Sequence, residues 1–393
     1  MIFDFILFIT FVVFAIAYLV WRRKSIILQP ILAFGPVHII SMVLVKRKWG
    51  IALMDYIAKK YTAWVQMFGY ISIGAGFLGI ALNLILLVFM VRTLLETPSL
   101  QQVALVLPFQ EIPHLGYLSF VHWIIAIFIL ATVHEFAHGV VARAWKVPVD
   151  SSGFAFLSLF RWIPVIPAAF VEPNQKKFQK TKDYIQYAVL GAGPISNILL
   201  AIPFALMLLF LFPAIDAQVL EFEGIYFEQV NQSHAAGIAG VQARTIYSTY
   251  NNQTIDPNLF FAHLQYRYQP GDTIYLGNEN RTHVITLDEH PNIPGRAYLG
   301  IIGIHTRYDY SQDFSENLHK PYEWIKELIK WLFIFNLGIG LINLMPLYIT
   351  DGGQFVRIFA QKWYPNQANK IYHIICGAAL YILLAALLIP FFF

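Results

Sequence analysis

The sequence predicts a polytopic α-helical membrane protein, with about six transmembrane helices and one small β-rich domain outside the membrane. The chain of 393 residues is 58% hydrophobic and only 13% charged, whereas a soluble domain is about 45–50% apolar and about 25% charged. The apolar residues gather in long runs, and the polar residues gather in basic loops and one long segment. A soluble enzyme and a disordered chain are excluded, and the small net charge of +4 predicts no nucleic-acid partner.

Six runs without Asp, Glu, Lys or Arg come close to or exceed the roughly 20 apolar residues that a spanning helix requires. They are Phe5–Trp21, Tyr61–Val91, Ile112–His134, Ile185–Ile215, Trp331–Thr350 and Ile371–Phe393. The first run ends at three basic residues, Arg22–Lys24, and lacks both a preceding basic segment and an obvious cleavage site. We therefore expect it to be a retained anchor rather than a removed signal peptide.

Lysine and arginine predict the orientation, because cytoplasmic loops carry an excess of these residues. The loops after the first, third and fifth runs are basic, whereas Glu96–Tyr117, between the second and third runs, has no Lys or Arg. We therefore expect both termini to be extracytoplasmic. The apolar runs are expected to lie within the lipid bilayer. The basic segment Ser25–Lys60 contains apolar residues as well, and we expect it to lie on the membrane surface.

A long polar segment, Phe212–Tyr322, lies on the predicted outer side. Short alternating runs at Thr245–Tyr247, Thr273–Leu276 and His283–Leu287 predict a small β-rich domain. Asn231, Asn252 and Asn280 each begin a triplet that fits a glycosylation acceptor, although chance occurrence explains such triplets equally well.

The third run continues into His134-Glu135-Phe136-Ala137-His138. This is the H-E-x-x-H pattern, in which two histidines one helical turn apart bind one zinc ion and the glutamate acts on a water molecule. Ionisable residues at membrane depth mark functional sites, so zinc binding is favoured over a pair of hydrogen-bonded structural histidines. Cys376 is the single cysteine, which excludes a cysteine-rich zinc module.

A catalytic zinc requires a third protein ligand, and Asp351 is the candidate carboxylate at the inner end of another run. We expect Pro346 to break the helix before it and Gly352-Gly353 to permit a tight turn. Taken alone, Asp351 is better explained as a helix-capping residue at the start of the next segment.

The fourth run contains Gly191-Ala-Gly193-Pro194-Ile-Ser-Asn197. Two interpretations of Asn197 are equally supported. It donates a hydrogen bond to the substrate or oxyanion, or it makes a structural contact between helices. From the predicted orientation, His134 lies roughly 15 Å deep and Asn197 roughly 18 Å deep from the cytoplasmic side. With Asp351, they share the cytoplasmic half of the membrane.

These residues resemble the site-2 protease family of intramembrane zinc metalloproteases. The resemblance rests on three motifs in three different runs: His134-Glu135-x-x-His138, Gly193-Pro194-x-x-Asn197 and Asn343-x-x-Pro346-x-x-x-x-Asp351-Gly352. It implies that His134, His138 and Asp351 bind one Zn²⁺, that Glu135 is the general base, and that Asn197 and, with less support, Asn343 hold the substrate or oxyanion. The implied reaction is hydrolysis of peptide bonds in or near the transmembrane segments of membrane-protein substrates.

The resemblance also implies a domain organisation. Residues 1–111 would hold two helices and the basic segment, 112–215 the first part of the protease core, 216–322 a PDZ-like outer domain, and 323–393 the second part of the core with a C-terminal helix. A membrane-associated β-hairpin is expected at 150–172. Read without the resemblance, Gly153–Pro164 is an interfacial hairpin, a re-entrant segment or a loop packed on the bilayer. Thr350 stands where the family often has Leu.

Two other function classes remain open from the sequence. A metal transporter would use the same histidines and Asp351 but has no need of Glu135, and internal repeats would be expected. An inactive membrane scaffold would be expected to have lost at least one of the four residues. The sequence leaves the substrate and the oligomeric state open.

Overall fold

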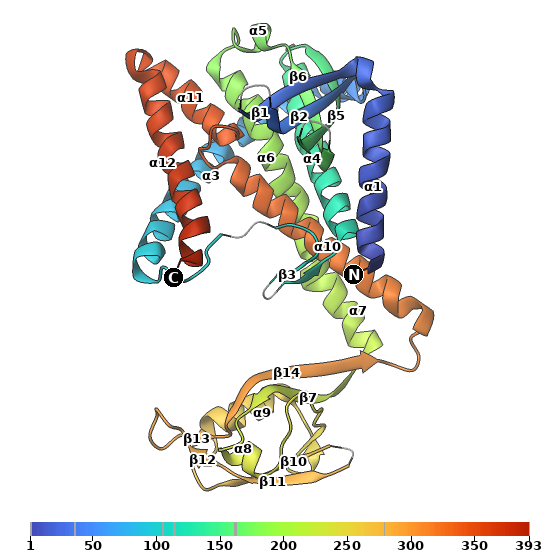
Figure 1. Ribbon diagram of the computed structural model, residues 1–393, viewed down its shortest axis with the longest axis vertical. Helices are drawn as coiled ribbons and strands as arrows, with labels where there is room; N and C mark the ends of the chain where they lie inside the picture. Colours follow the sequence, from blue (N-terminus) through green and yellow to red (C-terminus); the bar gives the residue numbers. More distant parts are fainter. Residues whose placement is uncertain are drawn as a thin grey trace. The chain divides into compact units, whose positions relative to one another are not determined.

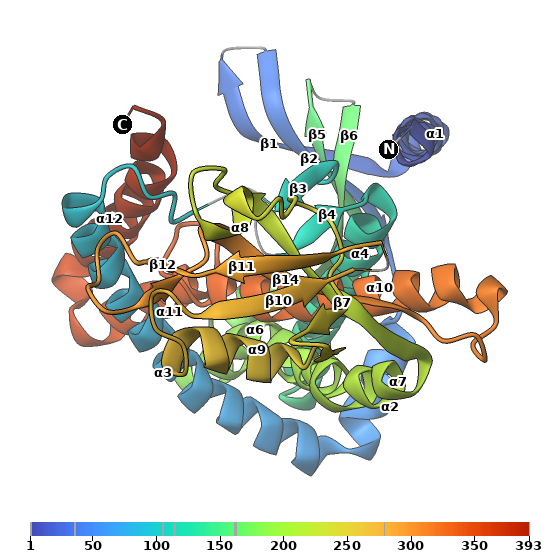
Figure 2. The ribbon, with the colours of Figure 1, turned by 90° about the horizontal axis from the view of Figure 1, so that it is seen from below.

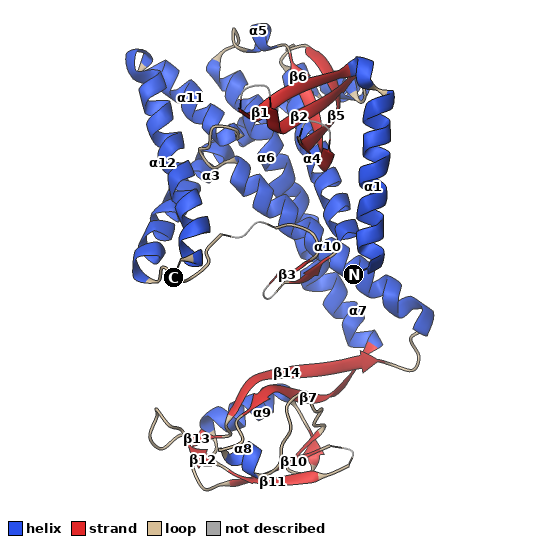
Figure 3. Ribbon diagram, viewed as in Figure 1, coloured by secondary structure: helices blue, strands red, loops and turns tan. Residues whose placement is uncertain are grey.

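The computed structural model describes residues 2–34, 37–103, 106–112, 115–160, 163–278 and 280–392. The chain forms two compact units, one joining Met1–Leu209 with Trp324–Phe393 and the other consisting of Phe210–Glu323. Helices dominate the first unit and strands are prominent in the second, as Figure 3 shows. The expected outer domain at 216–322 falls within the second unit.

The first unit is a bundle of apolar helices (Figure 1). Its helices are α1 (Ile2–Trp21), α2 (Ile51–Lys60), α3 (Thr62–Glu96), α4 (Phe120–Ala144), α5 (Gln175–Phe178), α6 (Asp183–Leu206), α11 (Asp351–Trp363) and α12 (Ala368–Leu388), with α10 (Glu316–Asn343) entering from the second unit. Short helical turns lie at Arg23–Ser25, Pro365–Gln367 and Ile389–Phe391, and a π-helix lies at Met207–Leu211.

Five helical stretches among the described residues are long and apolar enough to cross a membrane. They are Ile2–Trp21, Thr62–Glu96, Phe120–Ala144, Asp183–Val219 and Pro365–Phe391. The expected run Trp331–Thr350 is not one of them, because α10 carries charged side chains up to Lys330 and ends at Asn343. The helix thus ends just before Pro346, as predicted.

The third expected run stopped too early. The run ended at His134, whereas α4 continues to Ala144 and includes Glu135 and Arg143. A charge-free run ends at the first charged residue, so it is shorter than a helix that contains a carboxylate, such as that of Glu135.

A four-stranded antiparallel sheet, ordered β1-β2-β5-β6, lies at one end of the helices (Figure 1). Its strands are β1 (Ile26–Phe34), β2 (Val37–Arg47), β5 (Val149–Leu159) and β6 (Ile163–Pro173). The predicted hairpin is confirmed as β5–β6, whose pairing runs from Val149–Pro173 to Leu159–Ile163; residues 161–162 of its turn lie outside the described residues. A second hairpin, β3 (Gln110–Ile112) and β4 (Gly116–Leu118), is short.

The basic N-terminal segment is part of this sheet, which the sequence did not predict. β2 pairs with β5, with Ile40 opposite Leu159 and Arg47 opposite Ser152, so the hairpins β1–β2 and β5–β6 lie side by side in Figure 2. β6 is consequently an edge strand. It contains Pro164, Pro167 and Pro173, which suits an edge because proline has no backbone N–H to donate.

Two ion pairs attach the N-terminal segment to the rest of the unit. Arg143 of α4 donates two hydrogen bonds to the Asp55 carboxylate of α2, and this contact lowers the pKa of Asp55. Lys46 of β2 lies 2.5 Å from the Glu172 carboxylate of β6, and its hydrogen bond lowers the pKa of Glu172. The two ends of the chain lie at the end of the helices opposite the sheet (Figure 1).

The second unit contains a long two-stranded ribbon, β7 (Leu220–Val230) with β14 (Ile301–Tyr310). Its other elements are α7 (Phe212–Val219), α8 (Ala235–Ile238), β8 (Thr249–Tyr250), β9 (Gln253–Thr254), α9 (Pro257–Tyr266), β10 (Thr273–Gly277), β11 (Thr282–Thr286), β12 (Asp288–Glu289) and β13 (Ala297–Tyr298). The small sheet has the order β11-β10-β8-β9, and β12 pairs with β13.

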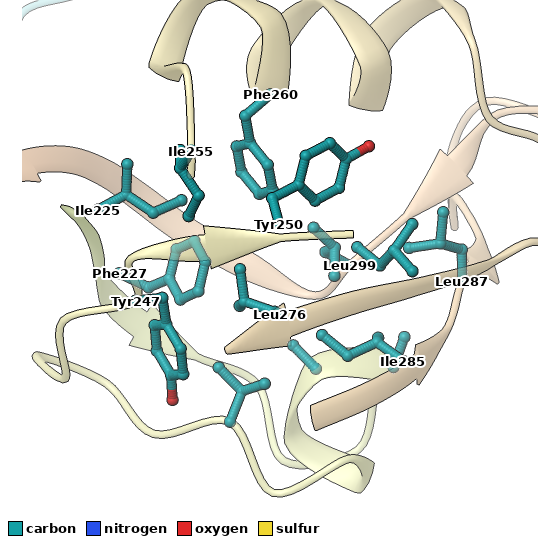
Figure 4. Packing of buried hydrophobic residues seen from close by; sticks show 14 of the residues in the cluster. Ile225, Phe227, Tyr247, Tyr250, Ile255, Phe260, Leu276, Ile285, Leu287 and Leu299 are labelled. Carbon is teal, nitrogen blue, oxygen red and sulfur yellow. The ribbon is translucent and has the colours of Figure 1, made fainter. Parts of the chain in front are cut away.

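This unit has its own hydrophobic core, in which Phe227, Tyr247, Phe260 and Ile285 are fully buried (Figure 4). The predictions of strands at Thr273–Leu276 and His283–Leu287 are confirmed by β10 and β11, where buried and exposed residues alternate as the period of a strand requires. The prediction at Thr245–Tyr247 was wrong. Tyr247 forms only an isolated bridge with Ile225, and the strand is β8. The three candidate acceptors, Asn231, Asn252 and Asn280, are exposed.

Candidate metal centre and active site

The two motif histidines lie on one face of α4. His134 and His138 are one helical turn apart, both are buried, and their Nε2 atoms are 3.1 Å apart. The prediction that the motif lies on a helix is confirmed.

Asp351 lies in the first turn of α11, directly after the Thr350 N-cap. Its Oδ2 lies 3.2 Å from His134 Nε2 and 3.5 Å from His138 Nε2. The ligand atoms of these three residues all lie within 4.8 Å of one another. Ligands bound at about 2.0–2.1 Å to a tetrahedral metal ion lie roughly 3.3 Å apart, so the three atoms have the spacing that a single ion requires.

Hydrogen bonds to the other ring nitrogens orient the two imidazoles. The Nδ1 of His138 lies 2.6 Å from the carbonyl oxygen of Val189 in α6. A carbonyl can only accept, so Nδ1 of His138 carries the proton and Nε2 keeps its lone pair for a metal. The Nδ1 of His134 lies 3.3 Å from Nδ2 of Asn197.

Gly193 of α6 keeps the space beside the two histidines open. A Cβ at this position would lie 2.4 Å from His138 Nε2 and 2.7 Å from His134 Nε2, closer than any van der Waals contact. Any larger residue would therefore enter the space beside the Nε2 atoms of His134 and His138. The small residues of α6 allow neighbouring helices to approach closely, as expected. Gly193 in addition leaves room beside the two histidine rings.

The turn before Asp351 is stabilised by Thr350. Its hydroxyl donates to the carbonyl of Met345 at 2.6 Å and accepts from the N–H groups of Leu347 and Gly353 at 3.2 Å each. The expectation that Gly352-Gly353 forms a tight turn was wrong, since both residues lie within α11. Gly353 is instead needed for close packing, because a Cβ there would lie 1.8 Å from the Leu347 oxygen.

Glu135 lies next to His134 in α4 but faces the sheet. Its Oε2 accepts a 2.9 Å hydrogen bond from the backbone N–H of Val171 in the edge strand β6. Glu135 also lines an apolar cavity of about 190 Å³ between α4 and β5–β6. The candidate base is therefore held at the contact between α4, which carries the two candidate ligand histidines, and the edge of the sheet.

The structure brings Asn197 to the histidines, but not Asn343. Asn197 is fully buried, whereas Asn343 is half-buried at the end of α10, and no described hydrogen bond joins it to His134, His138 or Asp351. The sequence reading also missed two buried asparagines. Asn83 of α3 donates to the Leu341 carbonyl near the end of α10 at 3.0 Å. Asn336 of α10 is fully buried. It could have been noticed in the sequence as a polar residue within an apolar run.

Comparison with known proteins identifies the family. The sequence matches peptidase family M50 over residues 122–387, which includes the three residues of the candidate metal centre. The chain belongs to peptidase family M50. An uncharacterized protein of Methanocaldococcus jannaschii is 27% identical over 162 residues, which are 40% of this chain and 40% of that protein. The alignment thus spans less than half of that relative.

Peptidase family M50 is the site-2 protease family, to which the three sequence motifs point. The five apolar helices agree with an integral membrane protein, and the three converging residues agree with the metal-dependent chemistry of M50 enzymes. The M50 match begins at residue 122, so α1, α2, α3 and the hairpin β1–β2 lie outside it.

Proposed function

We propose that the protein is a zinc metalloendopeptidase that hydrolyses peptide bonds in or near the transmembrane segments of membrane-protein substrates. The observation that carries this proposal is the convergence of His134, His138 and Asp351, whose ligand atoms are 3.1–3.5 Å apart. Two imidazole nitrogens and one carboxylate oxygen are a donor set for catalytic zinc, which leaves a fourth position open. Bound zinc would supply a Lewis acid. It would make a water molecule easier to deprotonate, so that this water could attack a carbonyl near neutral pH.

Glu135 would be the general base and then the general acid. Its carboxylate would take the proton of the attacking water and later give a proton to the amine that leaves. The hydrogen bond from Val171 N–H fixes one carboxylate oxygen, so the other oxygen is available for the proton. This placement supports the general-base role of Glu135.

Asn197 would contact the substrate through its amide. Its Oδ1 is buried without a hydrogen-bond partner, while Nδ2 faces His134 Nδ1. Rotating the amide by half a turn would let Oδ1 accept from a protonated Nδ1 of His134, which leaves Nε2 of that ring free for zinc. The NH₂ group would then take the unpartnered position and could donate to a substrate carbonyl or oxyanion. Asn343 is assigned to the substrate on the resemblance of its motif alone.

The edge strand β6 would receive the substrate. An unwound segment that pairs with β6 would lie beside Val171 and hence beside Glu135, which is β-augmentation. The position of β6 at the end of the sheet supports this assignment. The partners would be single- or multi-span membrane proteins within the lipid bilayer.

The predicted orientation completes the proposal. Both termini and the second unit, which would be a PDZ-like domain, would be extracytoplasmic, with the metal centre in the cytoplasmic half of the membrane. Both chain ends lie at the end of the bundle opposite the sheet, which includes Lys46 and Arg47 of the basic segment, and this supports the orientation (Figure 1). Glycan attachment at the exposed Asn231, Asn252 or Asn280 in a glycosylating host would provide a direct check.

The deciding experiment compares wild type with Glu135→Gln. The variant should retain one zinc per chain and lose hydrolysis by at least about a hundredfold, which is a typical contribution of a general base. Comparative membrane proteomics should then show transmembrane stubs accumulating in cells with the variant. If wild type and variant leave identical stubs while both carry zinc across vesicle membranes, transport replaces proteolysis as the function.

A further inference from the structure

The cavity beside Glu135 is built partly from the N-terminal segment. It has a volume of about 190 Å³ and is lined mainly by apolar side chains. Three elements supply its walls: α4, the β5–β6 hairpin and the segment at the start of α2. The lining residues that matter here are Trp49, Met54, Phe128, Glu135, Phe154 and Val171.

Met54 forms the inner end of the cavity. Its side chain is 2% exposed, whereas Trp49 and Phe128 are 52% and 47% exposed, so the cavity runs from an accessible rim to a buried end. The sulfur of Met54 lies against Gly139, where a Cβ would approach it to 2.5 Å. Gly139 follows Glu135 by one helical turn, so Met54 packs against the same side of α4 as the candidate base.

The rim is held in place by contacts between the N-terminal segment and the hairpin. The Trp49 ring meets the Phe154 ring edge-on at 5.0 Å between centroids. The Ser152 hydroxyl donates to the Trp49 carbonyl at 2.5 Å. The position of Trp49 is therefore coupled to β5, and the cavity does not depend on a free loop.

We propose that this cavity binds one apolar side chain of the substrate, adjacent to the scissile bond, and that Met54 and Trp49 set the size of that side chain. The inference rests on the proposed function. It follows from geometry: Glu135 and Val171 line the cavity and hydrogen-bond each other, so a chain lying along β6 with its carbonyl near Glu135 places a neighbouring side chain at the opening. Both selecting residues precede residue 122, where the M50 match begins.

The chemistry of the walls defines the occupant. An apolar cavity of about 150 Å³ holds one benzene molecule, so this cavity has room for a side chain of the size of Leu, Met or Phe. An acidic side chain is excluded because it would lose its hydration beside the carboxylate of Glu135. Removing the thioether of Met54 would deepen the cavity and favour larger side chains.

The test uses the full-length protein in detergent and a mixture of synthetic single-span peptides. The peptides carry Ala, Leu, Phe, Trp or Asp at varied positions near one membrane boundary, and mass spectrometry identifies each cleaved bond. We expect wild type to prefer Leu and Phe over Ala and Asp beside the cleaved bond. Met54→Ala should shift the ratio of cleavage rates by about tenfold toward Phe and Trp, a typical effect of changing pocket size.

Two further variants make the result specific. Trp49→Ala changes the exposed rim and should reduce the preference for Leu and Phe over Ala, without disturbing the buried end. Leu53→Ala is the matched control, since Leu53 lies beside Met54 on α2, is 52% exposed and does not line the cavity. Cleavage that depends on Glu135 but has the same side-chain preference in all four proteins would overturn the proposed pocket and leave the proposed function intact.

Absence of any Glu135-dependent cleavage would instead overturn the proposed function. The proposed pocket can then be tested without turnover. The same peptides, now carrying photo-leucine, are photo-crosslinked to the Glu135→Gln protein. Crosslinks at Trp49, Met54 or Phe128 support the pocket. Crosslinks confined to other surfaces overturn it.

Discussion

The carboxylate of Asp4 accepts a 2.7 Å hydrogen bond from the backbone N–H of Phe120, the first residue of α4. Asp4 lies in α1 and is buried, and its other oxygen lies 3.4 Å from the N–H of Val121. The first N–H groups of a helix have no partner within the helix. The first apolar helix therefore caps the helix that carries His134, Glu135 and His138.

We predict that Asp4→Leu destabilises the protein by about 1.5–3 kcal/mol, the net value of hydrogen bonds to a charged group. Thermal unfolding in detergent should show a lower Tm, and Asp4→Asn should fall between wild type and Asp4→Leu because one oxygen remains. Thr10→Ala is the control, since the Thr10 hydroxyl donates to Ile6 within α1 itself. Equal losses for Asp4→Leu and Thr10→Ala would show that the cap contributes nothing.

Gly193→Ala should abolish metal binding. The new Cβ would lie 2.4 Å and 2.7 Å from the Nε2 atoms of His138 and His134, in the space that an ion would need. We expect less than about a tenth of the wild-type metal content by elemental mass spectrometry, because displaced ligands cannot adopt the required geometry. Gly338→Ala on α10 is the matched control, as its Cβ would meet nothing within 4 Å. A Gly193→Ala protein with one metal ion per chain would contradict the proposed centre.

The Asp55–Arg143 pair should make stability depend on pH. The Arg143 hydrogen bond lowers the pKa of Asp55 below its usual 3.8, so the folded state favours the charged form. A group with a lowered pKa stabilises the protein above its unfolded pKa and loses that contribution as the pH falls through the folded pKa. We expect Asp55→Asn to cost about 1 kcal/mol at pH 7 and progressively less below about pH 4.

The measurement is the difference in Tm between wild type and Asp55→Asn at several pH values. Glu96→Gln serves as the control, because Arg92 and Glu96 form an exposed pair of a kind that contributes little. A difference that stays constant from pH 7 to pH 3 would mean that Asp55 acts through packing and not through its charge.

Removing residues 220–310 should release a size restriction on substrates. Leu220 and Tyr310 are directly opposite each other in the β7–β14 ribbon, so their backbones lie about 5 Å apart and a two-residue Asn-Gly link can join the neighbouring residues. We expect the shortened protein to cleave a substrate with an intact outer domain faster than wild type does. A substrate trimmed beforehand should be cleaved equally by both, and identical rates in all four combinations would argue against a filtering role.

The candidate metal-binding residues could be predicted from the sequence because the chemistry fixes their spacing. Two histidines one turn apart on an apolar helix, and a carboxylate after a proline-broken helix, require no knowledge of tertiary contacts. The β5–β6 hairpin was predicted, but its pairing with the N-terminal hairpin could not be predicted in this way. The pairing of Ile40 with Leu159 joins segments far apart along the chain, and nothing in the local pattern of either segment specifies its partner.

Asn197 and Thr350 illustrate the same limit at single residues. The sequence marks Asn197 as a polar residue in an apolar run, which leaves structural and catalytic roles equally open, and it marks Thr350 only as a departure from the Leu that the family often has. Only the fold shows that Asn197 lies 3.3 Å from His134 and that the Thr350 hydroxyl stabilises the turn before Asp351. The contribution of Met54 to the cavity is likewise a consequence of how α2 packs on α4.

The separation of the candidate ligands between α4 and α11 has a consequence for synthesis. When α4 has been translated, the chain possesses both histidines and Glu135 but not Asp351, and the whole second unit must be made before the third ligand emerges. Until then we expect only weak metal binding, since two imidazoles alone leave half of the coordination sites unfilled. Under the proposed function, the nascent chain should therefore be inactive while it and its neighbours are still entering the bilayer, and it should gain proteolytic activity only when its own insertion is nearly complete.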